Sequence, residues 1–552
     1  MDSNKQMAEL LFPDITKTPE DYEELYPARN LSEGAIVTRF APSPTGFLHF
    51  GGLFAAFVEK TAAKTTDGIF YLRIEDTDKK REVENGVELI VKGLNDFGID
   101  IDEGMISQTE EKGDYGPYMQ SQRTSIYHSF VKRLVEQGLA YPCFMTEDEL
   151  AKIREEQEAA KVLPGVYGEF AKYRDISFEE AEKRIKNGDE YVVRLKSPGS
   201  ADNRVKFTDL IKGDIEMPEN ILDVVLLKKD GTPTYHFAHA VDDHLMRTTH
   251  VIRGDEWISS VPIHLQLFKV CGFKPLKYVH ISPIMKEENG GKRKLSKRKD
   301  PEAAVSYYGE EGYPKGAVWE YLMTLANSNY EDWRLANKDS DIEDFKFSLK
   351  KMSKAGALFD IVKLADVSKN YISKLSAEEV YEMVTDWAQE NNERLYKLLV
   401  DDEEYAKSIF AIERGNAKPR KDIASWSDVQ NYVSYFYSEL WNGERSFPEN
   451  LSNEDMIEIL ENYKQIYTED TSSEDWFPAV RDMAVSLGYA KAPKEYKKNP
   501  DEFRGHVGDV AGVIRAAATG RLNTPDLYEI LQVLGYDEVI KRFDEAIDKL
   551  RG

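Results

Sequence analysis

The sequence predicts an α/β protein with a domain built on a parallel sheet, an insertion within that domain, and an all-α region after it. Residues 35–74 read as strand, helix and strand with short connections, which is the repeating unit of a parallel sheet. Residues 116–220 break this rhythm with charged helical segments. Beyond about residue 360 the strand signals fade and amphipathic helices dominate.

Composition narrows the class of protein. The 552 residues are 41% hydrophobic and 31% charged, as in globular proteins. A formal net charge of −26 argues against general affinity for nucleic acid or anionic membranes, although a local basic groove stays compatible with it. The two cysteines, Cys143 and Cys271, are too few for a disulfide framework or a Cys-rich zinc site. Because no signal-peptide core and no 18-residue apolar run occur, we expect a soluble, cytoplasmic protein.

The individual elements follow from capping residues, turns and apolar runs. Thr18 and Pro19 predict a helix start, and Gly68 ends the helix of the first strand–helix–strand unit. The expected elements, in order, are a helix from 18–21 onward, a strand over 35–41, a helix over 51–64, a strand over 69–74, and further sheet strands over 223–227 and 234–238.

The segment from Arg39 to Gly52 carries the first chemical signal. It connects a strand to a helix at the carboxyl edge of the predicted sheet, where open α/β sheets bind ligands and a helix N-terminus attracts phosphate. Gly51 and Gly52 lack a β-carbon, so a flat group such as adenine could lie against the backbone there. With Arg39, Ser43 and His49 in the same segment, a ligand site is favoured over an ordinary turn.

A basic run from Lys292 to Lys299 carries the second signal. Between Lys286 and Asp300 there are seven basic and three acidic residues, and glycines precede the run. A solvated charge run is the ordinary interpretation of such a stretch. A movable cationic loop is also what stabilising a leaving pyrophosphate requires.

These segments resemble the HIGH and KMSKS signatures of class I aminoacyl-tRNA synthetases. The wider wording is similar to that of bacterial glutamyl-tRNA synthetases: VTRFAPSPTG-LH-GG, RIEDTD, PTY-F-VDDH, THVIRGDEW and KLSKRK, followed by RAAATGRLNTPDLYEIL near the end. Five motifs in the order and at the spacing of that family make chance implausible. The resemblance implies a Rossmann-type catalytic domain, an inserted domain that binds the acceptor end of tRNA, and a helical anticodon-binding region.

The resemblance also implies the reaction and the residues that carry it. Glutamate would be joined to AMP from ATP, with Mg²⁺ accompanying the ATP, and the glutamyl group would pass to the terminal adenosine of tRNA(Glu). The implied catalytic residues are His49, Lys294 and Lys297. The implied glutamate ligands are Arg39, Ala41, Ser43, Glu75, Tyr235, His239 and Arg253. The implied ATP ligands are Ser43, Thr45, His49, Gly51, Gly52 and Lys297.

The charges of glutamate fit three of these residues. Arg39, Glu75 and Arg253 each end or follow an apolar strand, so all three could meet at the carboxyl edge of the sheet. An arginine suits a carboxylate, and Glu75 would pair with the substrate ammonium. Two positions depart from the family: Gly52 stands at the last HIGH position, and His239 stands where relatives often carry Asn. We expect no metal site and no zinc, and we expect the other seven histidines to have packing or surface roles.

Several alternatives stay open at this point. The enzyme could also charge tRNA(Gln) with glutamate, or it could be a glutaminyl enzyme or a non-catalytic tRNA-binding paralogue. Arg253 and the helical C-terminal half favour a glutamyl enzyme over a glutaminyl enzyme. A monomer that binds tRNA and no membrane is expected. The predicted domains are an N-terminal extension (1–33), the catalytic domain in two halves (34–115 and 221–285), the insertion (116–220), the KMSKS loop and stem-contact region (286–360) and the helical region (361–552, with a possible division near 445).

Overall fold

The computed structural model describes residues 3–78, 82–296, 298–468 and 470–552. The chain divides into two compact units, which we describe separately. The N-terminal unit comprises Met1–Tyr307 and Trp319–Asp360, and the C-terminal unit comprises Tyr308–Val318 and Ile361–Gly552. The finer domain limits given above stay a prediction.

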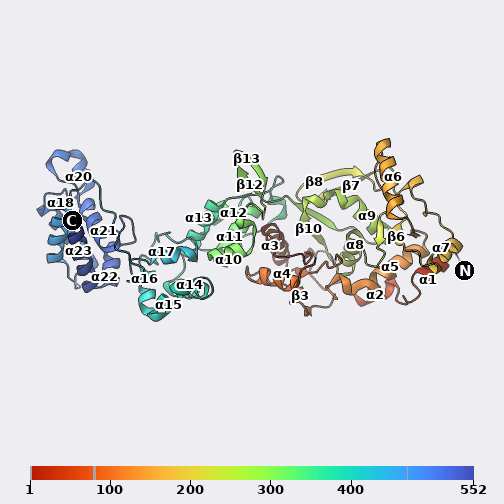
Figure 1. The fold of residues 1–552 in the computed structure, drawn as a ribbon, viewed down its shortest axis with the longest axis horizontal. Helices are drawn as coiled ribbons and strands as arrows, with labels where there is room; N and C mark the ends of the chain where they lie inside the picture. The colour runs from red at the N-terminus through yellow and green to blue at the C-terminus, as the bar shows by residue number, and fades with distance from the viewer. Residues whose placement is uncertain (1–2, 79–81, 297, 469) are drawn as a thin grey trace. The chain divides into compact units, whose positions relative to one another are not determined.

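A parallel sheet forms the centre of the N-terminal unit (Figure 1). β1 (Val37–Phe40) pairs in parallel with β2 (Ile69–Leu72), and β2 pairs in parallel with β3 (Glu103–Met105). β10 (His250–Gly254) pairs in parallel with β11 (Lys277–Ile281). The Thr249 N–H donates to the Val37 carbonyl at 2.9 Å, which joins β10 to β1. The strands therefore run in the order β3-β2-β1-β10-β11, and the predicted parallel α/β sheet is confirmed.

Helices precede or follow the parallel strands in the chain. α3 (Phe50–Lys64) follows β1, α4 (Gly86–Asn95) follows β2, α8 (Tyr235–Leu245) precedes β10, and α9 (Val261–Val270) follows it. All four residues of β1 are buried, as expected for a strand covered on both faces.

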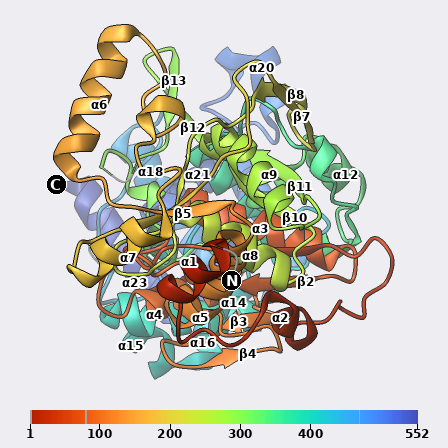
Figure 2. The same cartoon turned by 90° about the vertical axis from the view of Figure 1, so that its right-hand side faces the viewer.

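The insertion contributes an antiparallel sheet and a hairpin. β6 (Val192–Leu195) lies between β5 (Ala140–Cys143) and β9 (Val225–Leu227), antiparallel to both. β7 (Arg204–Asp209) and β8 (Gly213–Pro218) form the hairpin. Its helices are α5 (Thr124–Glu136), α6 (Glu147–Ala160) and α7 (Phe178–Lys186), and Figure 2 shows α6 well apart from the parallel strands β10 and β11.

Two strand predictions are wrong. Residues 223–227 were expected in the parallel sheet, but β9 joins the antiparallel sheet of the insertion. Residues 234–238 were expected to be a strand, but Tyr235 begins α8. The physical reason is that α8 is buried over most of its surface, so its apolar run lacks the one-sided pattern that distinguishes a helix from a buried strand.

The N-terminal extension and the basic hairpin complete this unit. α1 (Ser3–Leu11) precedes α2 (Pro19–Leu25), which is capped by Thr18 as predicted. The hairpin consists of β12 (Met285–Glu288) and β13 (Gly291–Lys294), joined through Asn289 and Gly290, both with positive φ as a tight hairpin turn requires. The other helices and strands of this unit are β4 (Glu111–Lys112), α12 (Tyr330–Ala336) and β14 (Leu358–Phe359). The helices α10 (Ser306–Glu311) and α11 (Lys315–Ala326) each have residues in both units.

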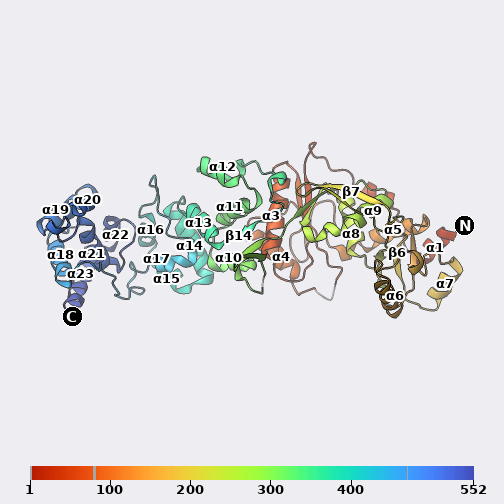
Figure 3. The same ribbon diagram turned by 90° about the horizontal axis from the view of Figure 1, so that it is seen from above.

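The C-terminal unit is helical in the part of it that the structure describes, which confirms the predicted all-α region. One continuous apolar core runs through it, from Ile372 to Ile547. In Figures 1 and 3, α18, α21 and α23 lie side by side. Its helices are α13 (Ile361–Ile372), α14 (Ala377–Asn391), α15 (Glu393–Asp401), α16 (Glu403–Ala411), α17 (Val429–Tyr432), α18 (Asn453–Ile466), α19 (Ser473–Ser486), α20 (Pro493–Lys498), α21 (Val507–Thr519), α22 (Leu527–Leu534) and α23 (Tyr536–Arg551).

Candidate active site

A cavity of about 800 Å³ lies at the carboxyl ends of β1, β2 and β10. Segments that are far apart in the sequence supply its walls, as expected for a ligand site of an open α/β sheet. The predicted site residues that line it are Arg39, Ala41, Ser43, His49, Gly51, Gly52, Glu75, Tyr235, Arg253 and Lys294.

Two described residues of the predicted set are not among those that line the cavity, and a third falls outside the described residues. Thr45 belongs to the turn after β1, where its N–H donates to the Ser43 carbonyl at 2.8 Å. His239 is fully buried and stacks on the ring of Tyr235, with the ring centroids 5.9 Å apart. Lys297 lies outside the described residues. The roles assigned to all of these residues stay a prediction.

A buried ion network holds Arg39. Its Nε donates to both carboxylate oxygens of Asp243, at 3.1 and 3.2 Å, and its Nη1 donates to the Ile252 carbonyl. Arg73 donates to the same Asp243 at 2.5 Å and to Glu75 at 3.3 Å. Burial opposes ionisation of Asp243, but the two guanidinium charges outweigh it and keep the pKa of Asp243 well below its usual value. The positive charge of Arg39 is therefore largely matched within the protein.

Glu75 lies at the other end of this network. Burial raises the pKa of its carboxyl, although the charges of Arg73 and Arg39 act in the opposite direction. A cation arriving in the cavity would favour the charged form of Glu75. The arrangement therefore suits a substrate that carries an ammonium group.

Arg253 is held quite differently. Only 7% of its surface is exposed, and its guanidinium donates to His280, Tyr235, His264 and the Trp257 carbonyl. No carboxylate oxygen of the described residues lies within 4.0 Å of it. A buried cation in neutral surroundings is an electrostatic match for an anionic ligand.

His49 forms the N-cap of α3. Its Nδ1 accepts a hydrogen bond from the Gly51 N–H at 2.8 Å, so the neutral ring carries its proton on Nε2. A β-carbon on Gly51 would lie 3.1 Å from that Nδ1, which is tight against the capping ring. The first turn of α3 thus lies at the cavity with the positive end of its dipole, which favours a phosphate there. Within this turn the Gly51 N–H is bonded to His49 Nδ1, and the Gly52 N–H donates to the His49 carbonyl at 2.7 Å.

The basic run is partly neutralised. Arg293 donates to both oxygens of Asp300, at 2.6 and 2.8 Å, and Lys286 lies 3.2 Å from the same carboxylate. Lys294, at the end of β13, lines the cavity instead. Of the described cations in this run, Lys294 is therefore the one placed to meet a ligand in the cavity.

Some cavity residues were not singled out from the sequence. Lys228 lines the cavity and donates to the Thr77 carbonyl at 2.8 Å, and Trp257 packs on Tyr235 with centroids 4.4 Å apart. Asp78 and Trp257 belong to the RIEDTD and GDEW motifs, so the motifs gave a signal for them. No sequence signal linked His264 and His280 to Arg253.

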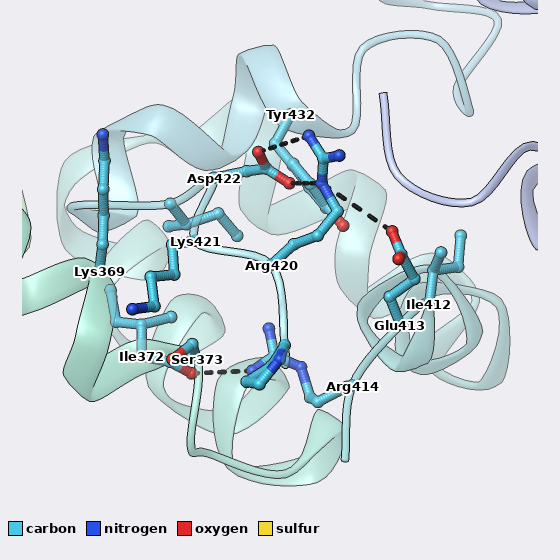
Figure 4. A pocket seen from close by; sticks show the side chains of 12 residues that line it. Lys369, Ile372, Ser373, Ile412, Glu413, Arg414, Arg420, Lys421, Asp422 and Tyr432 are labelled. Atoms are coloured by element: carbon cyan, nitrogen blue, oxygen red, sulfur yellow. Dashed lines mark hydrogen bonds and ion pairs between the residues drawn. The ribbon is translucent and has the colours of Figure 1, made fainter. Parts of the chain in front are cut away.

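The C-terminal unit has its own small pocket between α13, α16 and α17 (Figure 4). Lys369, Arg414, Arg420 and Lys421 contribute basic groups to it. Arg420 pairs with Asp422 at 2.7 Å, and Arg414 donates to the Ile372 and Leu375 carbonyls. Lys369 and Lys421 have no acceptor among the described residues, so they are the cations most available to a polyanion.

Two features are absent from the described residues. They contain no group of three His, Cys, Asp or Glu side chains arranged to hold a metal ion. Among them, no helix combines the length and hydropathy needed to span a bilayer.

Comparison with known proteins agrees with this geometry. Residues 35–366 match the catalytic domain of class I tRNA synthetases (E and Q), and residues 379–547 match an anticodon binding domain. A "Glutamate--tRNA ligase" of Clostridium perfringens strain SM101 is 54% identical over 549 residues, covering 99% of this chain and 100% of that protein. A "Glutamate--tRNA ligase" of Acetivibrio thermocellus is 48% identical over 544 residues, covering 98% of this chain and 100% of that protein.

A solved structure is similar over nearly the whole chain. The crystal structure of a glutamate tRNA ligase from Elizabethkingia meningosepticum, in complex with its amino acid, is 30% identical with a TM-score of 0.75 and covers 93% of this chain and 99% of that chain. The cavity at the carboxyl edge of the sheet, the motifs around it and these similarities lead to one conclusion: the chain belongs to the class I tRNA synthetases for glutamate and glutamine.

Proposed function

We propose that this protein is a glutamate–tRNA ligase that activates L-glutamate with ATP and transfers it to the terminal adenosine of tRNA(Glu). The observation that carries the proposal is the meeting of Arg39, Glu75 and Arg253 in one cavity with His49 and Lys294. The first three match the charges of glutamate, and the other two lie where the phosphates of ATP would be bound. The relatives named above, matched over almost their whole length, support the same substrates.

The proposed division of labour follows the electrostatics of the cavity. Arg39, Ala41, Ser43, Glu75, Tyr235 and Arg253 form the glutamate pocket, with His239 behind Tyr235. His49, Gly51, Gly52, Ser43 and Thr45 receive ATP. Lys294 and Lys297 stabilise the charge that develops on pyrophosphate as it leaves. Mg²⁺ would enter with ATP, bound mainly by phosphate oxygens and water, and we assign no residue to it.

The tRNA would be met by local basic groups, because a chain of net charge −26 repels a polyanion as a whole. We assign reading of the anticodon to the helices after residue 360, since sequence-specific RNA recognition favours unpaired bases. Lys369 and Lys421 at the pocket of the C-terminal unit support this assignment. The insertion (116–220) would receive the acceptor end.

Aminoacylation with purified components tests the function. Purified tRNA(Glu) and tRNA(Gln) are each offered glutamate and glutamine in four separate reactions with ATP and Mg²⁺. We expect charging in one of the four reactions, that of tRNA(Glu) with glutamate. Additional charging of tRNA(Gln) with glutamate would extend the proposal to an enzyme that does not discriminate between the two tRNAs, whereas charging with glutamine alone, or no charging, would contradict it.

A further inference from the structure

Arg253 lies in a shell of neutral hydrogen-bond acceptors. Its Nε donates to His280 Nε2 at 3.1 Å, and its Nη2 donates to His264 Nδ1 and to the Trp257 carbonyl, both at 3.3 Å. Its Nη1 donates to the Tyr235 hydroxyl at 3.2 Å. His264 and His280 are fully buried, so their rings are fixed by packing. Arg253 is thus oriented on every nitrogen without a carboxylate partner among the described residues.

The hydrogen bonds that His264 and His280 make on the side away from Arg253 determine which ring nitrogen carries the proton. His280 Nδ1 lies 2.8 Å from Asp209 Oδ2, and an ionised carboxylate only accepts, so the proton of His280 is on Nδ1 and its Nε2 is free to accept from Arg253. Asp209 is itself held by the N–H groups of Ile211 and Lys212. His264 accepts at Nδ1, so its proton is on Nε2 and is donated to His236 Nδ1, 2.9 Å away.

Both rings are neutral in this arrangement. Burial lowers the pKa of His264 well below its usual value, and the nearby charges of His239, Arg253 and His236 add to this effect against the raising effect of Asp243. Burial and Arg253 also lower the pKa of His280, against the raising effect of Asp209. A protonated ring would lose the lone pair that Arg253 uses and would place a second cation beside it.

Because the partners of Arg253 are imidazoles and not carboxylates, its charge is not neutralised. Asp243 holds Arg39 through its Nε at 3.1 Å, but it also neutralises Arg39. A buried cation without an anion is unfavourable until an anion arrives, and a neutral amide of the same shape does not satisfy it. Of the two carboxylates of glutamate, only the side-chain carboxylate keeps its charge when the other is joined to AMP, so it is the suitable partner for a permanent cation.

We propose that His264 and His280 are positioning residues for glutamate specificity: they aim the Arg253 guanidinium as neutral acceptors and so leave its charge to the side-chain carboxylate of the substrate. This inference rests on the proposed function, because it takes glutamate as the ligand of Arg253. It assigns to two residues outside the cavity wall the preference for glutamate over glutamine.

A pair of variants of equal size tests it. In His264→Asn the amide oxygen can replace Nδ1 as a neutral acceptor, whereas in His264→Asp a carboxylate at the same position neutralises Arg253. Both variants are assayed as full-length proteins with tRNA(Glu). For His264→Asn we expect kcat/KM for glutamate to stay within about 10-fold of wild type. For His264→Asp we expect it to be about 100-fold lower than for His264→Asn, mainly because KM rises. The ratio of kcat/KM for glutamate to that for glutamine should fall at least about 10-fold in His264→Asp only.

The outcomes separate the inference from the proposed function. If His264→Asn and His264→Asp lose the same activity and keep the same ratio of glutamate to glutamine, the charge at this position is irrelevant and the inference is overturned, although the function stands. If the wild-type protein does not use glutamate, the proposed function fails and the inference with it. Should His264→Asp not fold by circular dichroism, the same comparison is made with His280→Gln and His280→Glu, whose side chains reach the position of Nε2, and equal behaviour of that pair overturns the inference.

Discussion

Arg39 and Arg253 are each the penultimate residue of a parallel strand and line the same cavity, yet their surroundings are opposite in charge. Arg39 lies against the carboxylate of Asp243, with Glu59 at 4.0 Å. Arg253 lies against two imidazoles, a phenol and a backbone carbonyl. A buried arginine can therefore serve two purposes, and the charge of its partners distinguishes them.

The Arg39 side of the cavity is built to be stable before a ligand arrives. Asp243 contacts Arg39, Arg73 and His239 at once, and all of these groups are buried. The Arg253 side leaves one charge unmatched, so its electrostatic balance is completed by the ligand. We therefore expect substitutions on the first side to affect folding and substitutions on the second side to affect substrate use.

Asp243→Asn should have the largest effect. It keeps the shape of the side chain but leaves Arg39 and Arg73 buried with a neutral partner, and breaking a buried ion pair in this way costs about 3–5 kcal/mol. Urea unfolding followed by circular dichroism measures the loss. A free energy of unfolding within about 1 kcal/mol of wild type would show that the network does not support the fold.

Arg253→Ala should separate activity from stability. We expect kcat/KM for glutamate to fall by the equivalent of about 2–5 kcal/mol, because a charged partner of the substrate is lost. In the same urea assay its loss of stability should be smaller than that of Asp243→Asn, because no internal ion pair is broken and removal of a buried unmatched cation offsets the four hydrogen bonds that are lost. Near-normal kinetics would remove Arg253 from the glutamate pocket.

Lowering the pH should reduce the free energy of unfolding through protonation of His239, and this effect should be smaller than those of the two substitutions above. Burial lowers the pKa of folded His239 to about 4, from 6.5 in the unfolded chain. Between these values the unfolded state binds more protons, so stability is full above about pH 6.5 and is lost as the pH falls toward 4. From pH 7.5 to 5.5 the loss is about 1 kcal/mol for one such histidine. Calorimetry of wild type and His239→Asn at both pH values checks this, and equal pH dependence of the two proteins would contradict it.

The smallest effect concerns tRNA, where the same contrast between matched and unmatched cations recurs. Lys421 at the pocket of Figure 4 has no acceptor among the described residues, whereas Lys407 pairs with Glu403. Lys421→Ala should weaken tRNA binding a few-fold and reduce the slope of log K against log salt by about 0.9 if it meets a duplex phosphate, or about 0.7 on a single strand. Lys407→Ala is the matched control, and equal salt slopes for both variants and wild type would exclude Lys421 from the tRNA surface.

The sequence predicted the parallel sheet and most of the cavity, because the residues concerned lie in motifs at strand ends and helix starts. Arg39, His49 and Arg253 were identified in this way and line one cavity. The errors occurred where the local pattern does not indicate which face of an element is buried or which strand it pairs with. The apolar run from Tyr235 is buried on most sides, and β9 pairs with a strand about 30 residues earlier rather than with the parallel sheet.

The surroundings of Arg253 could not be predicted for a related reason. His264 and His280 follow Arg253 by 11 and 27 residues, on α9 and β11, and only the crossing of these elements brings them to the guanidinium. In the sequence they are scattered histidines without ligand spacing, and packing roles were expected for them. The pairing of Arg39 with Asp243 is equally distant, at 204 residues. Which arginine is neutralised is a property of the tertiary structure.

Calorimetric titration of the wild-type protein and of Arg253→Gln with glutamate and with glutamine measures whether the unmatched charge of Arg253 selects glutamate. The amide side chain of this variant is neutral but can still donate hydrogen bonds, so the substitution removes the cation and keeps part of the hydrogen bonding. Wild type should bind glutamate at least about 10-fold more tightly than glutamine, and this preference should disappear in Arg253→Gln through weaker glutamate binding. An undiminished preference for glutamate in Arg253→Gln would show that the charge of Arg253 does not select the substrate.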